Sequence, residues 1–275
     1  MSFYSEEVAS GRRFEFGSNW LRFLEALNEE RVNEAGRSLQ RMLKVEDLNG
    51  KTFIDVGSGS GLFSLSARLL GARTHSFDYD PDSVACTREL KRRYFAADPL
   101  WTVEQGSALD NNYLKSLGRF DIVYSWGVLH HTGAMWQALE NIASLVSDNG
   151  RLFISIYNDQ GRKSRLWKKV KALYNKTPRP LRFLVLCPAF VQLRMPSIIR
   201  DSLRGAPLST WRGYVKSRGM TPWRDVVDWV GGYPFEVAKP EELFYFYKDK
   251  GFILTELKTC GGGLGCNEFI FEKAS

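Results

Sequence analysis

Three glycines set between two acidic side chains are the residues of this chain with the clearest chemical meaning. Gly57, Gly59 and Gly61 alternate in the sequence. They follow a short apolar run in which Asp55 is the one charged residue. Glycine adopts positive φ freely and has no Cβ, so such a backbone can turn sharply and lie against a ligand. Asp78 stands 21 residues beyond Gly57, at the end of a second apolar run. A carboxylate there can accept hydrogen bonds from both hydroxyls of a ribose.

The spacing of the glycines separates two classes of cofactor. The dinucleotide fingerprint G-x-G-x-x-G needs a further glycine at position 62, where this chain has Leu62. A phosphate-binding loop closes with Gly-Lys-Ser or Gly-Lys-Thr, where this chain has Gly61-Leu62-Phe63. An acid at Asp55 opposes a pyrophosphate and suits a ligand that carries positive charge. The glycines alone leave a nicotinamide dinucleotide open, and Leu62 and Asp55 favour a cationic adenosine ligand.

The pattern G-x-G-x-G after an acidic strand residue resembles the first motif of class I S-adenosylmethionine (SAM) methyltransferases. Two later segments extend the resemblance, GSALD at 106–110 and SWGVLHH at 125–131. SAM has no phosphate and carries an ammonium and a sulfonium, which agrees with an acid beside the turn. The resemblance implies an enzyme that uses SAM, and it is much less specific for the methyl acceptor. The positions that it implies for cofactor binding are Asp55, Gly57, Ser58, Gly59, Gly61, Asp78, Tyr79, Ser107, Ala108 and Trp126.

Four of these positions have a more particular expected place. Members of the family set a polar residue and the next backbone amide at the adenine edge, and Ser107 and Ala108 match them, although an acid is commoner than serine there. Tyr79 matches a bulky residue that lies on the adenine face, or it is an ordinary surface aromatic. Trp126 is expected near the methyl group, because the strand before it ends at the cofactor edge of the sheet.

Apolar runs that alternate with helical patterns predict an α/β protein. We expect helices over 62–70, 134–146 and 240–250, and strands over 52–56, 73–77, 101–105, 120–125, 151–157, 252–258 and 267–272. This order resembles the seven-stranded, mostly parallel, doubly wound sheet of the family, whose last strand is antiparallel. The resemblance covers residues 50–157 and 240–275, which are expected to form the Rossmann-like domain that binds SAM.

Two further segments complete the expected domain organisation. Residues 1–49 are expected to form a helical segment over the cofactor site, because apolar residues recur at near-helical spacing between Ser18 and Leu43. Trp20 in this segment either contacts the methionine end of the cofactor and the substrate or is ordinary packing. Residues 158–239 are expected to form a basic helical insertion after strand five. Insertions on a rigid sheet commonly carry specificity for the acceptor.

Two adjacent histidines are the candidate catalytic residues. Methyl transfer is an in-line displacement, and it needs a base only when the acceptor must lose a proton. Histidine titrates near neutral pH, and both histidines follow a strand that ends at the cofactor edge. His131 is the first candidate and His130 the second. Both histidines could instead bond to the backbone and shape the pocket. The candidate substrate-binding residues lie at the ends of strands and in the N-terminal segment, and they are Tyr157, Asn158, Asn267 and Trp20.

The cysteines and the apolar runs indicate in which compartment the protein is expected and whether it is expected to bind a metal. Four cysteines in 275 residues do not make a disulfide framework. Cys260 and Cys266 have no histidine near them, so we expect no metal and interpret the glycines between them as a hairpin. No run of 18 uncharged apolar residues occurs, so we expect no membrane-spanning helix. The first sixteen residues lack the apolar core of a signal peptide, which predicts a cytoplasmic protein.

The formal charge of +7 comes from one segment of the chain. Between Asn158 and Pro240 there are 17 Lys or Arg and 5 Asp or Glu, against 21 and 26 in the remainder. Three functions fit this basic segment. It could cap a small acceptor, with a preference for an anionic one. It could bind RNA, since SWGVLHH is also similar to a stretch of tRNA wobble-uridine carboxymethyl-type transferases. It could lie on an anionic membrane through Phe183–Val191, an apolar run that Pro188 interrupts.

The predicted function is therefore a SAM-dependent methyltransferase. We expect its acceptor to be a small molecule with an oxygen, sulfur or nitrogen nucleophile, enclosed by the basic helical cap. The alternatives are an RNA methyl- or carboxymethyl-type transferase, a methyltransferase of a lipid-linked acceptor at the membrane surface, and a subunit that only binds a partner. The intact set of Asp55, the glycines and Asp78 disfavours the last, because an inactive site need not keep those residues.

Overall fold

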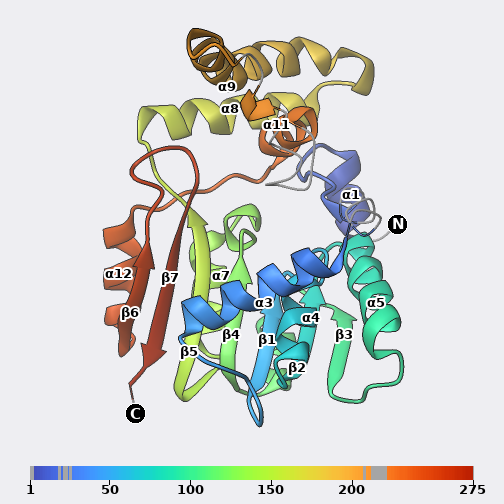
Figure 1. Ribbon diagram of the computed structural model, residues 1–275, viewed down its shortest axis with the longest axis vertical. Helices are drawn as coiled ribbons and strands as arrows, with labels where there is room; N and C mark the ends of the chain where they lie inside the picture. Colours follow the sequence, from blue (N-terminus) through green and yellow to red (C-terminus); the bar gives the residue numbers. More distant parts are fainter. Residues whose placement is uncertain are drawn as a thin grey trace. The chain divides into compact units, whose positions relative to one another are not determined.

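The chain divides into two compact units (Figure 1). The structure is a computed structural model that describes residues 3–17, 20, 24, 27–206, 209–211 and 222–274. The first unit, called the sheet unit below, comprises residues 17–161 and 236–275, and the helical unit comprises residues 1–16 and 162–235. The N-terminal segment that we expected as one piece over 1–49 is thus divided after residue 16. The insertion expected over 158–239 begins at 162 and ends at 235 as a compact unit.

Seven strands form a mixed sheet in the order β3-β2-β1-β4-β5-β7-β6. β7 runs antiparallel to both of its neighbours, and the other pairs are parallel. This topology confirms the predicted fold class, a doubly wound and mostly parallel sheet whose last strand is antiparallel. The strands are β1 (Thr52–Val56), β2 (Arg73–Asp78), β3 (Trp101–Gln105), β4 (Phe120–Trp126), β5 (Val146–Tyr157), β6 (Phe252–Lys258) and β7 (Cys266–Lys273).

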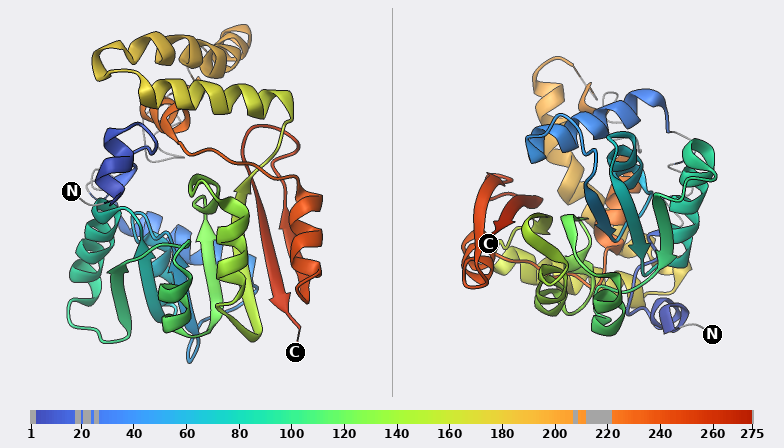
Figure 2. Two further views of the ribbon diagram at one scale, coloured as in Figure 1. Left: turned by 180° about the vertical axis from the view of Figure 1, so that it is seen from behind. Right: turned by 90° about the horizontal axis from the view of Figure 1, so that it is seen from below.

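Helices cover both faces of this sheet (Figure 2). On one face α3 and α4 pack on a buried cluster around Phe53, Tyr124 and Phe153, and α5 joins them at the β3 edge. On the other face α6, α7 and α12 pack on a larger cluster around Val123 and Ile154. The bounds of these helices are α3 (Glu29–Leu43), α4 (Leu62–Leu69), α5 (Pro81–Phe95), α6 (Asn111–Leu117), α7 (Met135–Ala143) and α12 (Pro240–Lys248).

Helix α3 forms because its apolar residues recur every three or four positions. Its buried side chains are Val32, Ala35, Leu39 and Leu43. Asn28 caps the N-terminus, where its Oδ1 accepts a hydrogen bond from the backbone N–H of Arg31 at 3.0 Å. The amphipathic pattern that we expected from Ser18 onward is thus helical over 29–43. Positions 18, 19, 21–23, 25 and 26 lie outside the described residues.

One expected boundary was wrong. The helix predicted over 134–146 ends at Ala143, because the residues after it pair with β4. The carbonyl of Leu145 accepts the backbone N–H of Phe120 at 2.7 Å, and Val146 is the register partner of Phe120. Strand β5 therefore begins at Val146 and includes the Asn149–Gly150 turn, rather than beginning after it at Arg151.

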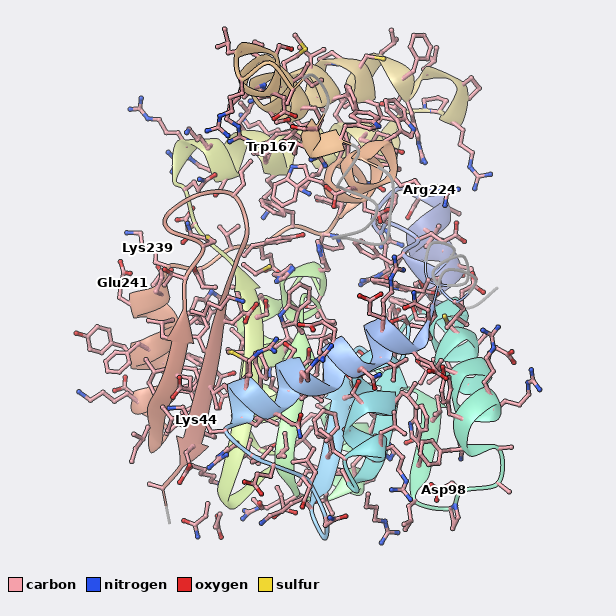
Figure 3. All side chains as sticks on the ribbon, in the orientation of Figure 1. Lys44, Asp98, Trp167, Arg224, Lys239 and Glu241 are labelled. Carbon is pink, nitrogen blue, oxygen red and sulfur yellow. The ribbon has the colours of Figure 1, made fainter. Side chains whose placement is uncertain are left out.

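The helical unit is built on α8, α9 and α11. Trp167 belongs to α8 (Figure 3). Its ring meets that of Trp229 of α11 edge-on, with ring centroids 5.7 Å apart. Lys171 of α8 is fully buried, its Nζ lies 4.1 Å from the centroid of the Trp229 ring, and burial lowers its pKa. The bounds in this unit are α1 (Phe3–Ala9), α8 (Arg162–Lys176), the short helix η2 (Arg179–Leu181), α9 (Phe183–Leu203) and α11 (Pro222–Gly231).

One helical segment of this unit, Arg179–Leu203, is long and apolar enough to cross a membrane by its length and composition. Our expectation of no membrane-spanning helix stays a prediction. It rested on the lack of a long uncharged apolar run, and Arg182, Arg194 and Arg200 interrupt this segment. Length and composition alone do not distinguish a spanning helix from other apolar helices, so the surroundings of α9 decide what it does.

The N-terminal ends of β1 and β4 are joined by a reciprocal set of hydrogen bonds. Oδ2 of Asp121 accepts the backbone N–H and the hydroxyl of Thr52, both at 2.8 Å. In return, the backbone N–H of Asp121 donates to Oγ1 of Thr52 at 2.9 Å. These bonds fix the two central strands in register at the end opposite the carboxyl edge. Asp121 therefore has a structural role.

We predict that Asp121→Ala lowers the free energy of unfolding by about 2 kcal/mol, because two donors of Thr52 lose their acceptor. Affinity for SAM should stay unchanged. Denaturant unfolding and titration calorimetry measure the two quantities. Asp148→Ala is the matched control, since Asp148 is an exposed acid that forms surface ion pairs with Arg119 and Lys273. Its loss should cost less than about 0.5 kcal/mol. Equal losses for the two variants would contradict the prediction.

Candidate active site

The three glycines after β1 all have backbone angles that favour glycine. Their φ values are 82° at Gly57, 53° at Gly59 and 78° at Gly61. A Cβ at Gly57 would overlap the side chain of Val128, and a Cβ at Gly61 would come within 2.9 Å of Thr87. Any larger residue would strain the turn and displace the segments packed on it. The turn is therefore an open stretch of backbone of the kind that lies directly against a ligand.

Hydrogen bonds to β2 hold this turn. The backbone N–H groups of Gly57 and Ser58 donate to the carbonyl of Phe77 at 2.9 and 3.0 Å. The N–H of Gly59 donates to Oδ2 of Asp78 at 2.9 Å. On the other side, the hydroxyl of Ser58 lies 2.9 Å from that of Thr87 in α5. The sequence predicted a cofactor-binding role for Gly57, Ser58, Gly59 and Asp78 and none for Phe77 or Thr87.

Asp55 is the end of a buried chain of donors. The indole N–H of Trp101 donates to Ser76 Oγ at 2.9 Å, and Ser76 donates to Ser64 Oγ at 2.8 Å. Ser64 in turn donates to Oδ2 of Asp55 at 2.5 Å. Asp55 is 2% exposed, and its burial raises its pKa to about 7 although Ser64 opposes the shift. Sequence reasoning found Asp55 and missed its three partners, which come from β3, β2 and α4.

Asp78 ends β2 with its carboxylate partly satisfied by the backbone. Oδ2 accepts the N–H of Gly59, and Oδ1 accepts the N–H of Asp80 at 2.9 Å. Burial raises its pKa to about 6. An ionised carboxylate has about four lone-pair sites, so both oxygens can accept further donors. Asp78 therefore has acceptor capacity for the ribose hydroxyls of an adenosine ligand, and this contact stays a prediction.

The positions expected around the adenine lie at the ends of β2 and β3. Asp78 and Gln105 are register partners, and Nε2 of Gln105 donates to the carbonyl of Tyr79 at 3.1 Å. The Ser107 hydroxyl accepts the N–H of Leu109 at 3.2 Å, so it already caps its own turn. Ala108 is buried and its carbonyl accepts the Asn141 amide. The adenine contacts of Tyr79, Ser107 and Ala108 stay predictions.

Trp20 lies over the glycine turn. A Cβ built on Gly59 would be 3.2 Å from two atoms of the Trp20 indole. The indole is thus placed against the backbone that is expected to hold the cofactor. The structure brings this N-terminal residue together with Gly59, and its contact with substrate stays a prediction.

The two histidines and Tyr157 form one ring cluster at the ends of β4 and β5. The ring centroid of His130 lies 4.5 Å from that of His131 and 3.9 Å from that of Tyr157. His131 and Tyr157 are 5.5 Å apart and nearly perpendicular. His130 is fully buried, and its Nδ1 accepts the backbone N–H of Tyr157 at 3.4 Å. His131 is 9% exposed, so it is the better placed of the two to meet an acceptor.

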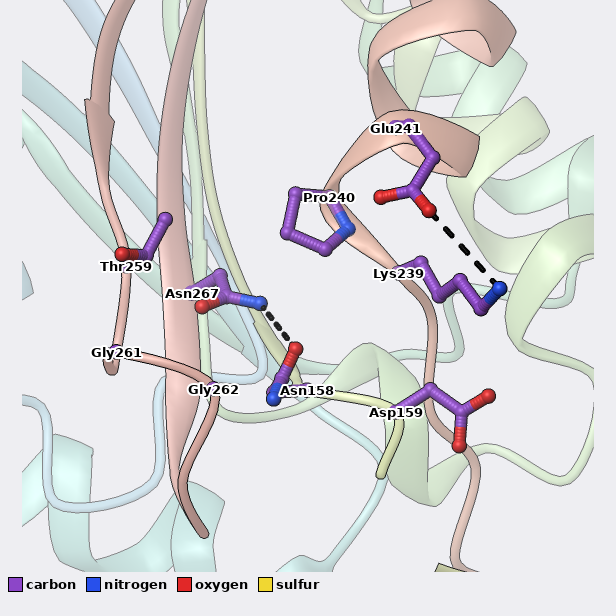
Figure 4. Close-up of a pocket in the computed structure, with 9 residues that line it drawn as sticks. All are labelled: Asn158, Asp159, Lys239, Pro240, Glu241, Thr259, Gly261, Gly262 and Asn267. Atoms are coloured by element: carbon purple, nitrogen blue, oxygen red, sulfur yellow. Dashed lines mark hydrogen bonds and ion pairs between the residues drawn. The ribbon is translucent and has the colours of Figure 1, made fainter. Parts of the chain in front are cut away.

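A cavity of about 390 Å³ opens at the ends of β5 and β7 (Figure 4). Two predicted substrate residues line it. Nδ2 of Asn267 donates to Oδ1 of Asn158 at 3.1 Å, and Oδ1 of Asn267 accepts the N–H of Cys260 at 3.0 Å. Asn267 is 1% exposed, so its main visible role is to hold the glycine loop of the cavity wall. The lining residues are Asn158, Asp159, Lys239, Pro240, Glu241, Thr259, Gly261, Gly262 and Asn267.

Trp126 connects the end of β4 to β7. Its indole N–H donates to Oε1 of Glu268 at 3.3 Å, and Nζ of Lys258 lies 3.4 Å from the same carboxylate. The Trp126 side chain is 45% exposed, which leaves its face available to a ligand. Its place near a methyl group stays a prediction. The cysteines of the loop are free thiols, and the described residues hold no group of three His, Cys, Asp or Glu that could bind a metal ion.

The sheet order, the open glycine turn and the acids at the ends of β1 and β2 define the fold of class I methyltransferases. A family model described as a methyltransferase domain matches residues 27–183, more than half of the chain. The chain belongs to this methyltransferase domain family. Its membership confirms the family, the enzyme class and the SAM cofactor that the sequence predicted.

Curated relatives match parts of the chain. Ubiquinone biosynthesis O-methyltransferase of Xanthomonas oryzae pv. oryzae is 27% identical over 135 residues, which are 49% of this chain and 52% of that protein. Ribosomal protein L11 methyltransferase of Methylococcus capsulatus is 36% identical over 69 residues, 25% of this chain and 24% of that protein. The chain thus matches about half of the length of the first relative and about a quarter of the second.

Solved structures share the fold. Magnesium protoporphyrin IX methyltransferase from Synechocystis PCC 6803, crystallised with bound S-adenosylhomocysteine, has a TM-score of 0.52 at 14% identity, and the match covers 100% of this chain and 89% of that one. An O-methyltransferase family protein from Burkholderia thailandensis has a TM-score of 0.52 at 13% identity, with 89% and 58% covered. At these identities the likeness shows the fold.

We predict that Asp78→Ala weakens SAM binding about 10- to 100-fold, because ribose hydroxyls lose a charged acceptor. Asp78 also holds the Gly59 N–H, so calorimetry should compare S-adenosylhomocysteine with its 2′,3′-dideoxy analogue. With wild-type protein the analogue should bind more weakly than its parent. With Asp78→Ala the two ligands should bind equally. If the variant still prefers the parent ligand, Asp78 acts through the turn and the ribose assignment is wrong.

The pKa of about 7 at Asp55 predicts opposite pH dependences for binding and for folding. An ionised Asp55 favours a cationic ligand, so SAM affinity should fall between about pH 8 and about pH 5.5. The folded state raises the pKa of Asp55 above the unfolded value of 3.8, so it favours the protonated acid. This contribution to stability is full below about pH 4 and is lost as the pH rises through about 7.

The difference between wild-type protein and Asp55→Asn isolates this group, since the ligand itself titrates equally with both. Calorimetry gives the affinity and denaturant unfolding gives the free energy of unfolding. We expect the difference in affinity to grow, and the difference in stability to shift against wild type, as the pH rises. Parallel pH profiles for the two proteins would show that Asp55 does not titrate in this range.

Proposed function

We propose that this protein transfers the methyl group of SAM to a small-molecule acceptor through an oxygen, sulfur or nitrogen nucleophile. The observation that carries the proposal is the cavity of about 390 Å³ at the ends of β5 and β7. Asn158 of its lining directly follows Tyr157 of the ring cluster in the chain. Pockets for small molecules typically have about 300–1,000 Å³. The names of the ubiquinone and protoporphyrin methyltransferases support an acceptor of this size.

Bound SAM supplies a methyl group on a sulfonium, which makes that carbon electrophilic. The residues of the chain then contribute position and charge. The glycine turn and Asp78 would fix the adenosine end, and Asp55 would offer negative charge to the cationic end. Tyr157 and Asn158, at the end of β5, would orient the acceptor. Holding both reactants in line can account for much of the acceleration of such a displacement.

His131 would remove a proton from an acceptor that must lose one. Its backbone is fixed in the short helix η1 (Leu129–His131), where its N–H donates to the carbonyl of Val128 at 2.8 Å. The neighbouring His130 is anchored on both sides. Its carbonyl accepts the N–H of Glu236 at 2.9 Å, and Oε2 of Glu236 accepts the N–H of Met135 at 3.0 Å. His130 would therefore position His131 rather than act as the base.

The acceptor class is tested by release of S-adenosylhomocysteine across panels of small metabolites, RNA and lipid-linked compounds. We expect turnover with a small molecule and none with the Asp78→Ala variant. Turnover only with tRNA, retained on the protein in a salt-dependent way, would overturn the small-molecule proposal. Turnover only with a prenylated acceptor in vesicles would instead support a lipid-linked substrate. SAM binding without turnover on any panel would favour a protein that only binds a partner.

We predict that His131→Ala lowers kcat about 100- to 10,000-fold for an acceptor that loses a proton, the usual range for a lost general base. KM should change little. His131→Gln and Tyr157→Phe are the matched comparisons, since each keeps most of the ring cluster filled. With a thiol acceptor, which ionises readily, kcat should fall much less. Unchanged kcat with a hydroxyl acceptor would show that His131 only shapes the pocket.

A further inference from the structure

Helix α9 of the helical unit carries its apolar residues on the outside. Its exposed large apolar side chains recur every three or four positions and are 40–84% exposed. The exposed polar side chains of α9 are Gln192, Arg200 and Ser202. A surface helix that faces water shows the opposite pattern. The outward face, as we call it below, consists of Phe183, Leu184, Cys187, Val191, Met195, Ile199 and Leu203.

The inner side of α9 holds charged groups that are paired. Arg194 donates to Oδ2 of Asp225 in α11 at 2.5 Å. Asp201 is 4% exposed and accepts the N–H and the hydroxyl of Thr210, both at 2.8 Å. The fold therefore pairs Arg194 and Asp201 inside the helical unit and leaves the apolar residues of this helix, with Arg200, outside. Larger exposed apolar patches mark sites that contact another protein or a membrane.

The charge of the segment that carries the outward face indicates what could cover it. From Arg162 to Arg204 the sequence has twelve Lys or Arg and one acid, Asp201. Most of the basic side chains of α8 are exposed, as are Arg200 and Arg204 at the C-terminal end of α9. Exposed apolar side chains in a segment rich in Lys and Arg match the interface of an anionic lipid bilayer.

We propose that the outward face of α9 inserts into the headgroup region of an anionic membrane, with exposed Lys and Arg of the same segment on lipid phosphates. The helix lies in the interface and does not span the bilayer. A spanning position would bury Arg194 and Asp201 in hydrocarbon, away from the partners that hold them. The proposal concerns the helical unit alone, so its failure would leave the proposed methyltransferase activity intact.

A second copy of the chain is the other occupant that could cover this face. It would bring two sets of twelve basic residues together, and like charges at an interface are repulsive. Anionic headgroups neutralise the same residues. The charge therefore favours lipid over self-association.

Co-sedimentation of the full chain with vesicles tests the proposal. The vesicles contain phosphatidylcholine with or without phosphatidylglycerol, at low and at high salt. The test variant is Val191→Glu/Met195→Glu, which puts two charges on the outward face. The matched control is Ile253→Glu/Leu257→Glu, which changes two exposed apolar residues of β6 in the sheet unit. Thermal unfolding and SAM calorimetry verify that each variant is folded.

We expect wild-type protein and the control variant to sediment with the anionic vesicles and to be released by salt. The outward-face variant should bind these vesicles at least about tenfold more weakly than wild-type protein. Failure of wild-type protein to bind anionic vesicles would overturn the proposal, as would equal binding by the two variants. A wild-type dimer in light scattering that the outward-face variant converts to a monomer, without vesicle binding, would assign this face to a second copy.

Discussion

The buried carboxylate of Asp55 is the constraint around which the cofactor edge is organised. A charged group at 2% exposure is costly unless donors surround it. The chain from Trp101 through Ser76 and Ser64 brings such donors from three other elements. Each bond requires its element at one position, so the chain fixes β2, β3 and α4 relative to β1. The glycine turn after Asp55 is therefore held in place by the elements around it, and the glycines themselves contribute no side chain.

Incomplete compensation of that charge is itself useful. Fully satisfied carboxylates have low pKa values, whereas burial keeps that of Asp55 near 7 and that of Asp78 near 6. Each acid is therefore stabilised when a proton binds to it or when a cationic ligand binds close to it. A ligand that carries a sulfonium and an ammonium supplies the charge without the proton. Because burial disfavours the ionised form of both acids in the free protein, binding of the cationic SAM is favoured over binding of neutral adenosine compounds.

The sequence predicted those parts of the protein that depend on local pattern. The strands from Thr52 to Gln105 and the glycine turn follow from short apolar runs and glycine spacing, and the antiparallel last strand follows from the resemblance to class I methyltransferases. Contacts between distant residues were beyond such reasoning. Ser64 and Ser76 are ordinary in their own segments and meet only in the folded sheet, and the helix after Ala134 is shortened by pairing of Val146 with Phe120. Asn267 was expected to meet a substrate, but both ends of its amide are used by Asn158 and Cys260.

The orientation of helix α9 could not be predicted from its sequence, for a different physical reason. Its faces differ little in apolar content, so the sequence does not indicate which face is buried, and Pro188 and Pro196 lie within the helix. Only the pairing of Arg194 with Asp225 and of Asp201 with Thr210 shows that the charged side faces the helical unit. The excess of basic residues lies between Asn158 and Pro240, whereas the remainder of the chain has 21 Lys or Arg and 26 Asp or Glu. The glycine turn, Asp55 and Asp78 belong to that acidic remainder. A net positive charge there would weaken the negative potential at Asp55 and Asp78, so the placement of the basic excess elsewhere in the sequence favours a cationic ligand at the cofactor site.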